Sequence, residues 1–251
     1  VIGDRLIYYG EMRPTATLEL MGGQLEMLRR IVATGKEFIL VSMSYKPLVI
    51  PEDILEAASA VIIQFSPGML GGQAFAEILF GDYAPSGRFT ITVPRHVGQI
   101  PVYYNKVRGG HQKDYADLSA KPRYAFGYGL GYSEIEYKSA TLEKSSLSKS
   151  DNLVVSVTVK NNGQFEQAEV IQVYIHDKVT SATWAEIELK GFERVVLKPG
   201  EEKKVQITIP ASECSIVNAK GERVVEPGAF QARVGKASDN ILFNLDFVIN
   251  E

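Results

Sequence analysis

A carboxylate on a short loop near the start of the chain is the residue best suited to chemistry. It is Glu11, in the segment Gly10-Glu11-Met12-Arg13-Pro14. A carboxyl group held in a partly desolvated loop can donate a proton and later take one back, which is general acid–base chemistry. Tyr9 and Arg13 flank it and are candidates for contacts with a bound molecule. An ordinary solvated turn uses the same residue types, so the segment alone leaves both interpretations open.

Other motifs with a chemical meaning do not occur in the sequence. There is no glycine-rich phosphate loop, no dinucleotide-binding glycine pattern after a strand and no nucleophile-elbow serine. The single cysteine, Cys214, excludes an intrachain disulfide and a cysteine metal site. The histidines, His96, His111 and His176, are too scattered for a zinc motif. The sequence therefore predicts no metal and no cofactor.

Composition and charge exclude several classes of partner. Of the 251 residues, 45% are hydrophobic and 23% are charged, as in a soluble globular protein. The formal net charge of −3 gives no reason to expect nucleic acid or an anionic membrane surface as a partner. No run approaches the roughly 20 apolar residues of a membrane-spanning helix. The cellular compartment stays unassigned.

The elements that must position Glu11 follow from the hydrophobic pattern of residues 1–93. Leu25, Leu28 and Val32 recur at helical spacing, and Gly35 follows as a C-cap glycine. The apolar run 38–41 fits a strand buried on both faces. The alternation then repeats with a helix from residue 51, a strand over 60–63 and a helix over 71–80. This order predicts a parallel sheet with helices on both sides, in an incomplete α/β layered domain.

Residues 134–251 follow a period of two instead. Apolar and polar residues alternate over 153–159 and over 205–209, and Asn161-Asn162-Gly163 is a typical turn sequence between such runs. Several short alternating strands predict an antiparallel β-sandwich. The Ser- and Lys-rich segment 144–151 is expected to be an exposed loop of this sandwich.

Residues 94–133 lie between these regions and are rich in Tyr, Gly, Lys and Arg. We expect a long ordered connection, because a segment of this length without a role is uncommon in a compact protein. Its aromatic residues are expected to pack it against its surroundings. They are Tyr124, Phe126, Tyr128 and Tyr132.

The first four residues, Val1-Ile2-Gly3-Asp4, have the pattern of a buried strand that ends in a loop. No start methionine or signal peptide precedes them. We therefore expect the chain to be a C-terminal piece of a longer protein.

Four segments in order give the chain a resemblance to a known family. The first is Gly10-Glu11 followed by Leu18-Glu19-Leu20, and the second is LFGDYAPSGR at 79–88. The third is FGYGLGY at 126–132, and the fourth begins with Glu188-Leu189-Lys190-Gly191-Phe192. This succession closely resembles the C-terminal half of glycoside hydrolase family 3 enzymes, the β-glucosidase and β-xylosidase group. The resemblance covers essentially the whole chain.

The resemblance implies a domain order and a divided active site. Family members of this type carry an N-terminal (β/α)8 barrel, then an α/β sandwich, then a fibronectin type III-like domain. Residues 1–93 would be the C-terminal part of the α/β sandwich and residues 134–251 the fibronectin type III-like domain, with the barrel absent from this chain. The family's barrel supplies an aspartate nucleophile, and the sandwich commonly supplies the acid/base glutamate, which matches Glu11.

The resemblance also bears on Tyr9, Arg13 and Trp184 as substrate-binding candidates. Many relatives carry an Asp-Arg pair after the glutamate, whereas this chain has Pro14-Thr15 there. This departure weakens the prediction of substrate contacts from this loop more than it weakens the prediction for Glu11. Trp184 lies in a loop that leans toward the aglycone side of the pocket in some relatives, so its indole could stack on a sugar. Burial of Trp184 against the neighbouring domain is favoured over this stacking. Arg88 is expected to anchor its loop through carbonyls or a carboxylate.

The sequence therefore predicts the C-terminal part of a retaining β-glycosidase that hydrolyses terminal β-linked sugars, with glucose as the favoured sugar. Its predicted partners are a glycoside substrate and the barrel segment, and a homodimer is left open. The isolated chain is expected to be inactive. One alternative is a noncatalytic carbohydrate-binding or structural module. Another is the same enzyme type acting on xylosides, arabinosides or N-acetylglucosaminides.

Overall fold

The structure is a computed structural model that describes residues 1–4, 15–109 and 114–251. It divides into two compact units. The first consists of residues 1–80, 93–102 and 121–123, and the second of residues 81–92, 103–120 and 124–251. The segment 94–133 is thus shared between the two units.

A three-stranded parallel sheet forms the centre of the first unit. Its strands, in spatial order, are β1 (Ile2–Gly3), β2 (Ile39–Met43) and β3 (Ala60–Gln64). Leu40 and Val41 are both buried, and because successive residues point to opposite faces, the middle of β2 is covered on both sides. This confirms the strand predicted from the apolar run.

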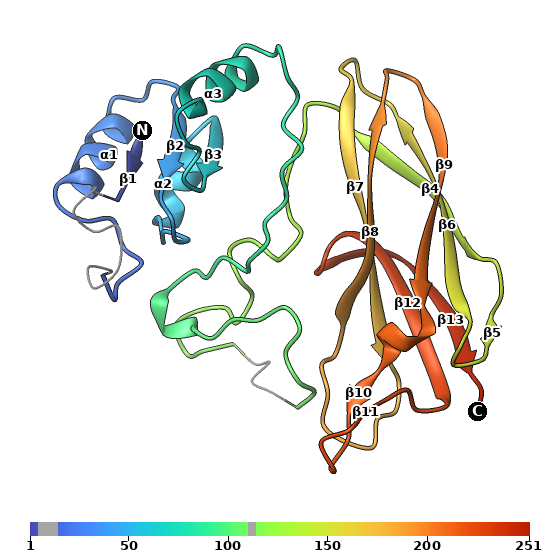
Figure 1. Ribbon diagram of the computed structural model, residues 1–251. Coiled ribbons are helices and arrows are strands. Elements are labelled where there is room, and N and C mark those ends of the chain that lie inside the picture. The colour runs from blue at the N-terminus through green and yellow to red at the C-terminus, as the bar shows by residue number, and fades with distance from the viewer. Residues whose placement is uncertain (5–14, 110–113) are drawn as a thin grey trace. The chain divides into compact units, whose positions relative to one another are not determined.

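Three helices accompany these strands (Figure 1): α1 (Gln24–Ala33) between β1 and β2, α2 (Glu52–Ala57) between β2 and β3, and α3 (Gly71–Leu79) after β3. Leu28 of α1 and Ile54 of α2 belong to the same buried cluster as Ile2 and Leu40 of the strands. Gly35, with a φ of 66°, follows α1 and donates its backbone N–H to the carbonyl of Val32, which confirms the predicted C-cap.

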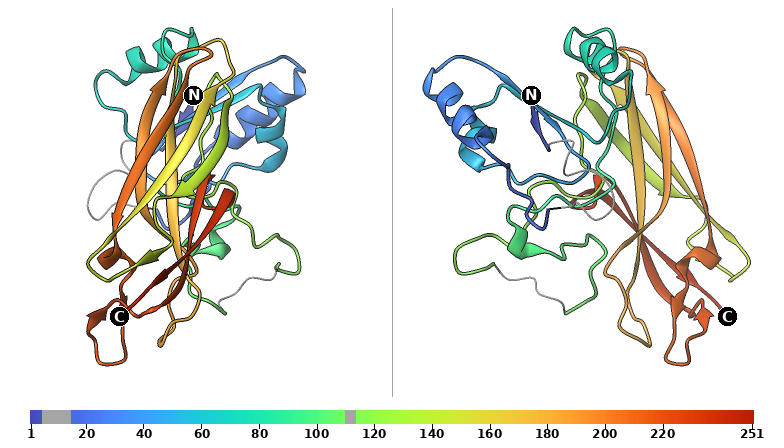
Figure 2. Two further views of the ribbon diagram at one scale, coloured as in Figure 1. Left: turned by 90° about the vertical axis from the view of Figure 1, so that its right-hand side faces the viewer. Right: turned by 60° about the vertical axis from the view of Figure 1, so that its left-hand side comes forward.

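Two sheets form the second unit, which Figure 2 shows from two further directions. One has the order β4 (Ile135–Leu142), β6 (Asn152–Asn161), β9 (Glu202–Pro210). The other has the order β5 (Ser146–Leu147), β13 (Asn240–Ile249), β12 (Gly228–Ala237), β7 (Gln167–Asp177), β8 (Glu188–Leu197). Two further strands, β10 (Ile216–Val217) and β11 (Arg223–Val224), pair with each other in a short antiparallel ribbon.

The core of the second unit lies between its two sheets. Every second residue of β6 from Leu153 to Val159 is completely buried, and Leu153 faces Ile209 of β9 in the strand register. Ile171 of β7 and Phe230 of β12 enter the same core from the other sheet. Full burial of one such side chain contributes about 1.5–3 kcal/mol, so the period-two pattern is the main source of stability here. The predicted sandwich is confirmed.

One expectation about this unit is wrong. The segment 144–151 is not simply an exposed loop, because Ser146 and Leu147 form β5, which pairs in parallel with Val248 and Ile249 of β13. The side chain of Leu147 is only 1% exposed and belongs to the core cluster. A two-residue strand with a single apolar side chain is too short to show a period, which is why the pattern did not reveal it.

The sequence FGYGLGY docks on β7 through its backbone. Gly127 has a φ of 83° and its carbonyl accepts a hydrogen bond from Gln172 Nε2 at 3.0 Å. A Cβ at Gly127 would lie 2.0 Å from Gln172 Oε1, so only glycine fits. Nearby, the ring of Tyr124 stacks on Phe89 at 5.4 Å, and that of Phe126 stacks on Tyr104 at 4.1 Å. These contacts confirm that aromatic residues of the connection pack.

The helices of the described residues are short. The longest, α1, spans 10 residues, and two 3-10 turns, η2 (Val97–Gln99) and η3 (Ala211–Cys214), complete the set. None of the helices in the described ranges has the length and apolar character needed to cross a membrane.

Candidate active site

Polar side chains gather where β1 and β2 end. Asp4 directly follows β1, and Ser44 and Lys46 follow β2. Ser44 Oγ donates a hydrogen bond to Asp4 Oδ2 at 2.7 Å, and Lys46 Nζ lies 3.9 Å from Asp4 Oδ1. The side chains of Lys46 and Asp4 are only 10% and 1% exposed, so water screens this pair weakly. The carboxyl ends of parallel strands are also where open α/β sheets bind ligands.

Lys46 also contacts the chain on the far side of the segment 5–14. Its Nζ donates hydrogen bonds to Thr15 Oγ1 and, at 2.7 Å, to the carbonyl oxygen of Thr17. Asp4 immediately precedes this segment and Thr15 immediately follows it. One buried ammonium group therefore contacts both ends of the segment.

Further contacts fix these ends to the first unit. The side-chain amide of Gln24 donates to and accepts from the backbone of Gly3, both at 2.9 Å. A Cβ at Gly3 would lie 1.9 Å from the carbonyl oxygen of Met43, so glycine is needed for this approach of β1 to β2. At the other end, Val49 N donates to the carbonyl oxygen of Leu18 at 2.8 Å, and the Leu18 side chain is buried. Both ends are thus held by the folded unit.

Three predicted site residues, Tyr9, Glu11 and Arg13, lie outside the described residues. The structure describes Asp4 and Thr15, the residues on either side of the segment 5–14 that carries them. The predictions for these three side chains stay predictions.

Sequence patterns did not point to Asp4, Ser44 or Lys46, although a usable signal exists. All three follow a strand end within three residues, in the positions where parallel strands present side chains at one edge. A search for polar residues directly after predicted strands would have found them.

Trp184 belongs to the second unit and is half-buried. Its indole Nε1 donates a hydrogen bond to Glu188 Oε2 at 2.8 Å, and Lys190 Nζ lies 3.5 Å from the same oxygen. A cavity of about 10 Å³ beside it, lined also by Asp177 and Cys214, has room for about one water molecule and none for a sugar. A sugar would have to use the exposed part of the ring, and stacking on Trp184 stays a prediction.

Asp177, on the wall of this small cavity, is in an unfavourable setting for a charge. Its Oδ1 accepts a hydrogen bond from Val179 N at 3.1 Å, whereas its Oδ2 is buried and has no hydrogen-bond partner among the described residues. Burial raises the pKa of Asp177. The folded chain then binds the Asp177 proton more tightly than the unfolded chain, so the contribution of this residue to stability falls as pH rises between the two pKa values.

Substituting Asp177→Asn should remove this cost. We expect the stability of the variant relative to the parent to increase as pH is raised from about 4 to about 6, the range above the unfolded Asp pKa. Urea unfolding followed by the fluorescence of Trp184, the single tryptophan, measures this. In the control Asp246→Asn, stability relative to the parent should instead fall as pH rises, and only below about pH 4, because hydrogen bonds from Lys178 and Gln231 lower the pKa of Asp246. A stability difference for Asp177→Asn that does not change with pH, or that changes in the same direction as for Asp246→Asn, would contradict a raised pKa for Asp177.

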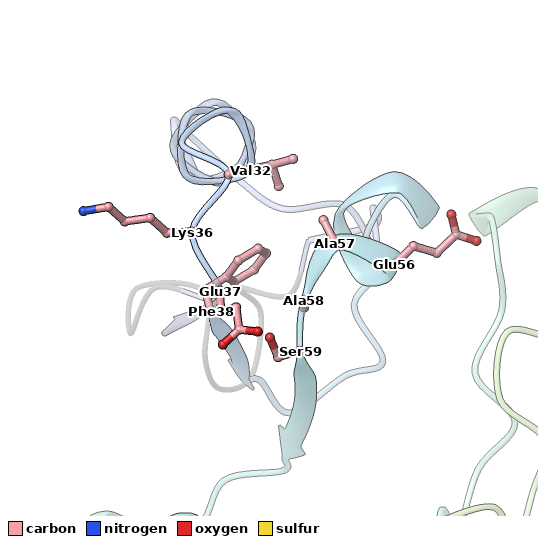
Figure 3. Close-up of a pocket in the computed structure, with 9 residues that line it drawn as sticks. Val32, Lys36, Glu37, Phe38, Glu56, Ala57, Ala58 and Ser59 are labelled. Carbon is pink, nitrogen blue, oxygen red and sulfur yellow. The ribbon is translucent and has the colours of Figure 1, made fainter.

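A larger hollow lies at the opposite ends of the strands (Figure 3). It has a volume of about 380 Å³ and is lined by residues 35–38, before β2, and residues 56–59, before β3. Figure 3 shows Lys36 and Glu56 pointing away from it, so it offers few converging polar groups. In residues 1–4, 15–109 and 114–251, no three His, Cys, Asp or Glu side chains are grouped to hold a metal. The carboxyl edge with Asp4 and Lys46 is therefore the stronger candidate site.

Comparison with family models gives two matches. Residues 1–132 match the glycosyl hydrolase family 3 C-terminal domain, and residues 169–238 match the fibronectin type III-like domain. The first match alone covers just over half of the 251 residues. The α/β unit and the β-sandwich thus correspond to domains of one family.

The names of similar proteins agree with these family models. The chain is 34% identical over 252 residues to a periplasmic β-glucosidase of Salmonella typhimurium, and 36% identical over 241 residues to a β-xylosidase of Formosa agariphila. The matches cover 96% and 95% of this chain but 33% of each relative. The chain therefore spans about a third of the length of these proteins.

Solved structures show the same fold. A β-glucosidase involved in saponin metabolism from intestinal bacteria matches 99% of this chain with a TM-score of 0.94 and 39% identity. A β-glucosidase from Listeria innocua in complex with glucose matches 99% with a TM-score of 0.92 and 32% identity. In both cases 36% of the solved chain is covered. The chain belongs to glycoside hydrolase family 3.

Proposed function

We propose that this chain supplies Glu11 as the acid/base residue of a retaining β-glycosidase, whose aspartate nucleophile comes from a (β/α)8 barrel segment. One observation carries the proposal: in a family 3 domain, both ends of the segment that carries Glu11 are fixed at the carboxyl edge of a parallel sheet. The substrate is a terminal β-glucoside. The names of several relatives, and the glucose bound by the Listeria innocua enzyme, support this choice.

Retaining hydrolysis requires two carboxyl groups with different protonation states. The aspartate attacks the anomeric carbon while the neutral acid gives its proton to the departing oxygen, which leaves a glycosyl-enzyme ester and an ionised Glu11. In the second step, Glu11 takes a proton from water as the water oxygen attacks the anomeric carbon and releases the aspartate. The two carboxyl groups stand about 5–5.5 Å apart in such enzymes. Tyr9, Arg13 and Trp184 are the proposed contacts to the substrate.

Xylosides are the second candidate substrates, because one of the relatives is named a β-xylosidase. Comparing kcat/KM for aryl β-glucosides and aryl β-xylosides with the full-length enzyme distinguishes the two. A ratio above one for the glucoside supports the first choice.

The stereochemistry of the product tests the mechanism. When the full-length enzyme hydrolyses an aryl β-glucoside, we expect proton NMR to detect the β-anomer of the sugar first, because two displacements retain the configuration. The isolated chain of 251 residues should release no sugar, since one carboxylate cannot perform both steps. Initial release of the α-anomer would contradict retention, and hydrolysis by the isolated chain would contradict the divided active site.

A further inference from the structure

We infer that Lys46 is a positioning residue for the segment that carries Glu11, because it joins the two ends of that segment in one buried cluster. The inference rests on the proposed acid/base role of Glu11. Lys46 comes from the segment after β2 and lies far along the chain from both ends that it contacts. It is therefore a tertiary connection and not part of a local turn.

The hydrogen-bond inventory of the cluster fits this role. A lysine ammonium group has three donors and no acceptor. Three oxygen-bearing groups surround Lys46 Nζ: the hydroxyl of Thr15, the carbonyl of Thr17 and, at 3.9 Å, the carboxylate of Asp4. Thr15 and Thr17 belong to one end and Asp4 to the other. The ammonium group thus connects the ends directly.

Burial makes the connection specific for a cation. The side chain of Asp4 is 1% exposed, and in the described part of the chain its partners are Lys46 and Ser44, whose Oγ donates to Asp4 Oδ2 at 2.7 Å. Among the described residues Lys46 is the cation paired with Asp4, and burying a carboxylate without its counter-charge is costly, so removing the ammonium group should destabilise this arrangement. The end of β1, where the chain enters the segment 5–14, would then have to shift to hydrate Asp4.

Such a shift would affect proton transfer more than binding. A general acid must lie within hydrogen-bond reach of the departing oxygen, and a displacement of about 1 Å can cost up to about 100-fold in rate. The loss should depend on the leaving group, because a dinitrophenolate departs with little protonation and a simple alcohol does not. A general loss of folded enzyme would lower both rates equally.

The test uses Lys46→Met in the full-length enzyme, with kcat/KM measured for a dinitrophenyl β-glucoside and an alkyl β-glucoside. We expect the alkyl rate to fall at least about tenfold more than the dinitrophenyl rate, and Lys46→Arg to recover most of this ratio. The matched control is Lys36→Met, at an exposed lysine after α1, which should leave both rates unchanged. In a Lys46→Met enzyme that is folded like the parent, an equal fall with both substrates, or no fall, would overturn the inference.

Two further variants keep the test decisive. Thr15→Val removes one acceptor of Lys46 at nearly constant volume, so it should show the same selectivity in weaker form even where Lys46→Met folds poorly. If the alkyl rate of Thr15→Val falls no more than its dinitrophenyl rate, the inference is overturned even where Lys46→Met folds poorly. Glu11→Ala must show the selective loss if the proposed function is correct. If it does and the Lys46 and Thr15 variants do not, only the positioning role fails; if Glu11→Ala does not, the proposed function fails.

Discussion

Replacing Glu11 with alanine in the full-length enzyme is expected to lower kcat/KM for an alkyl β-glucoside by roughly 100- to 10,000-fold, the usual contribution of general acid catalysis. The alkoxide leaving group is strongly basic and needs a proton as the bond breaks. The rate constant of the first step with a dinitrophenyl β-glucoside should change little. The second step should slow with every substrate, because water then attacks without a base. Steady-state and burst kinetics separate the two steps.

The matched control for this prediction is Glu19→Ala. Glu19 is an exposed carboxylate a few residues beyond the same segment, so its removal changes charge and composition in the same way. We expect kcat/KM to stay within about twofold of the parent for both substrates, as for surface substitutions in general. Equal losses in Glu11→Ala and Glu19→Ala would contradict a specific role for Glu11.

The second large effect concerns the stability of the second unit. Arg88 Nη2 lies 3.0 Å from Glu169 Oε2, and the two side chains are only 10% and 6% exposed. Tyr137 donates its hydroxyl to the other carboxylate oxygen at 3.0 Å, and burial, followed by the charge of Glu169, raises the pKa of Tyr137. Arg88→Ala should destabilise this unit by about 3–5 kcal/mol, because it leaves Glu169 buried and without its counter-charge. Urea unfolding followed by Trp184 fluorescence measures the loss.

Two variants test the cause of this loss. Arg194 contacts the same loop from the exposed side, through Tyr83 at 3.0 Å and Ser86 at 3.3 Å, so Arg194→Ala should cost less than about 1 kcal/mol. The double variant Arg88→Met, Glu169→Gln removes both charges and should recover part of the stability lost in Arg88→Ala. A loss for Arg88→Ala no larger than that for Arg194→Ala would contradict a buried ion pair as the anchor.

This ion pair confirms the role predicted for Arg88. Its Nη1 donates to the carbonyl oxygens of Ser86 and Gly87, both at 3.1 Å, in addition to the contact with Glu169. An arginine after Ser-Gly on a loop is compatible with several partners. Only the fold shows that the carboxylate paired with Arg88 is that of Glu169 on β7, 81 residues away along the chain.

Most of the fold could be predicted because its elements are long enough to show a period. In β6 the apolar residues alternate, and in α1 they recur at helical spacing. Each pattern repeats several times along its element, so a single exception does not hide it. β5, with two residues, gives no such repetition and was missed. The pairing of β5 with β13 depends on residues about 100 positions apart, which no local pattern contains.

The candidate site was predicted less completely, for the same reason. Glu11 could be proposed because its local sequence resembles that of a family, and the comparisons show that the chain belongs to this family. Asp4 and Ser44 are in contact across 40 residues, and Lys46 contacts Thr15 across 31 residues. Each of these residues alone is typical of a loop, and only the parallel pairing of β1 and β2 brings them together.

The central claim is that Glu11 is the acid/base residue, and the product formed by Glu11→Ala in the presence of azide tests it most directly. Azide needs no base to attack the glycosyl-enzyme, so the full-length variant should turn over a dinitrophenyl β-glucoside faster as azide is added. NMR should identify the product as the β-glucosyl azide, because two displacements restore the original configuration. Absence of both the rate increase and the β-glucosyl azide would contradict the claim.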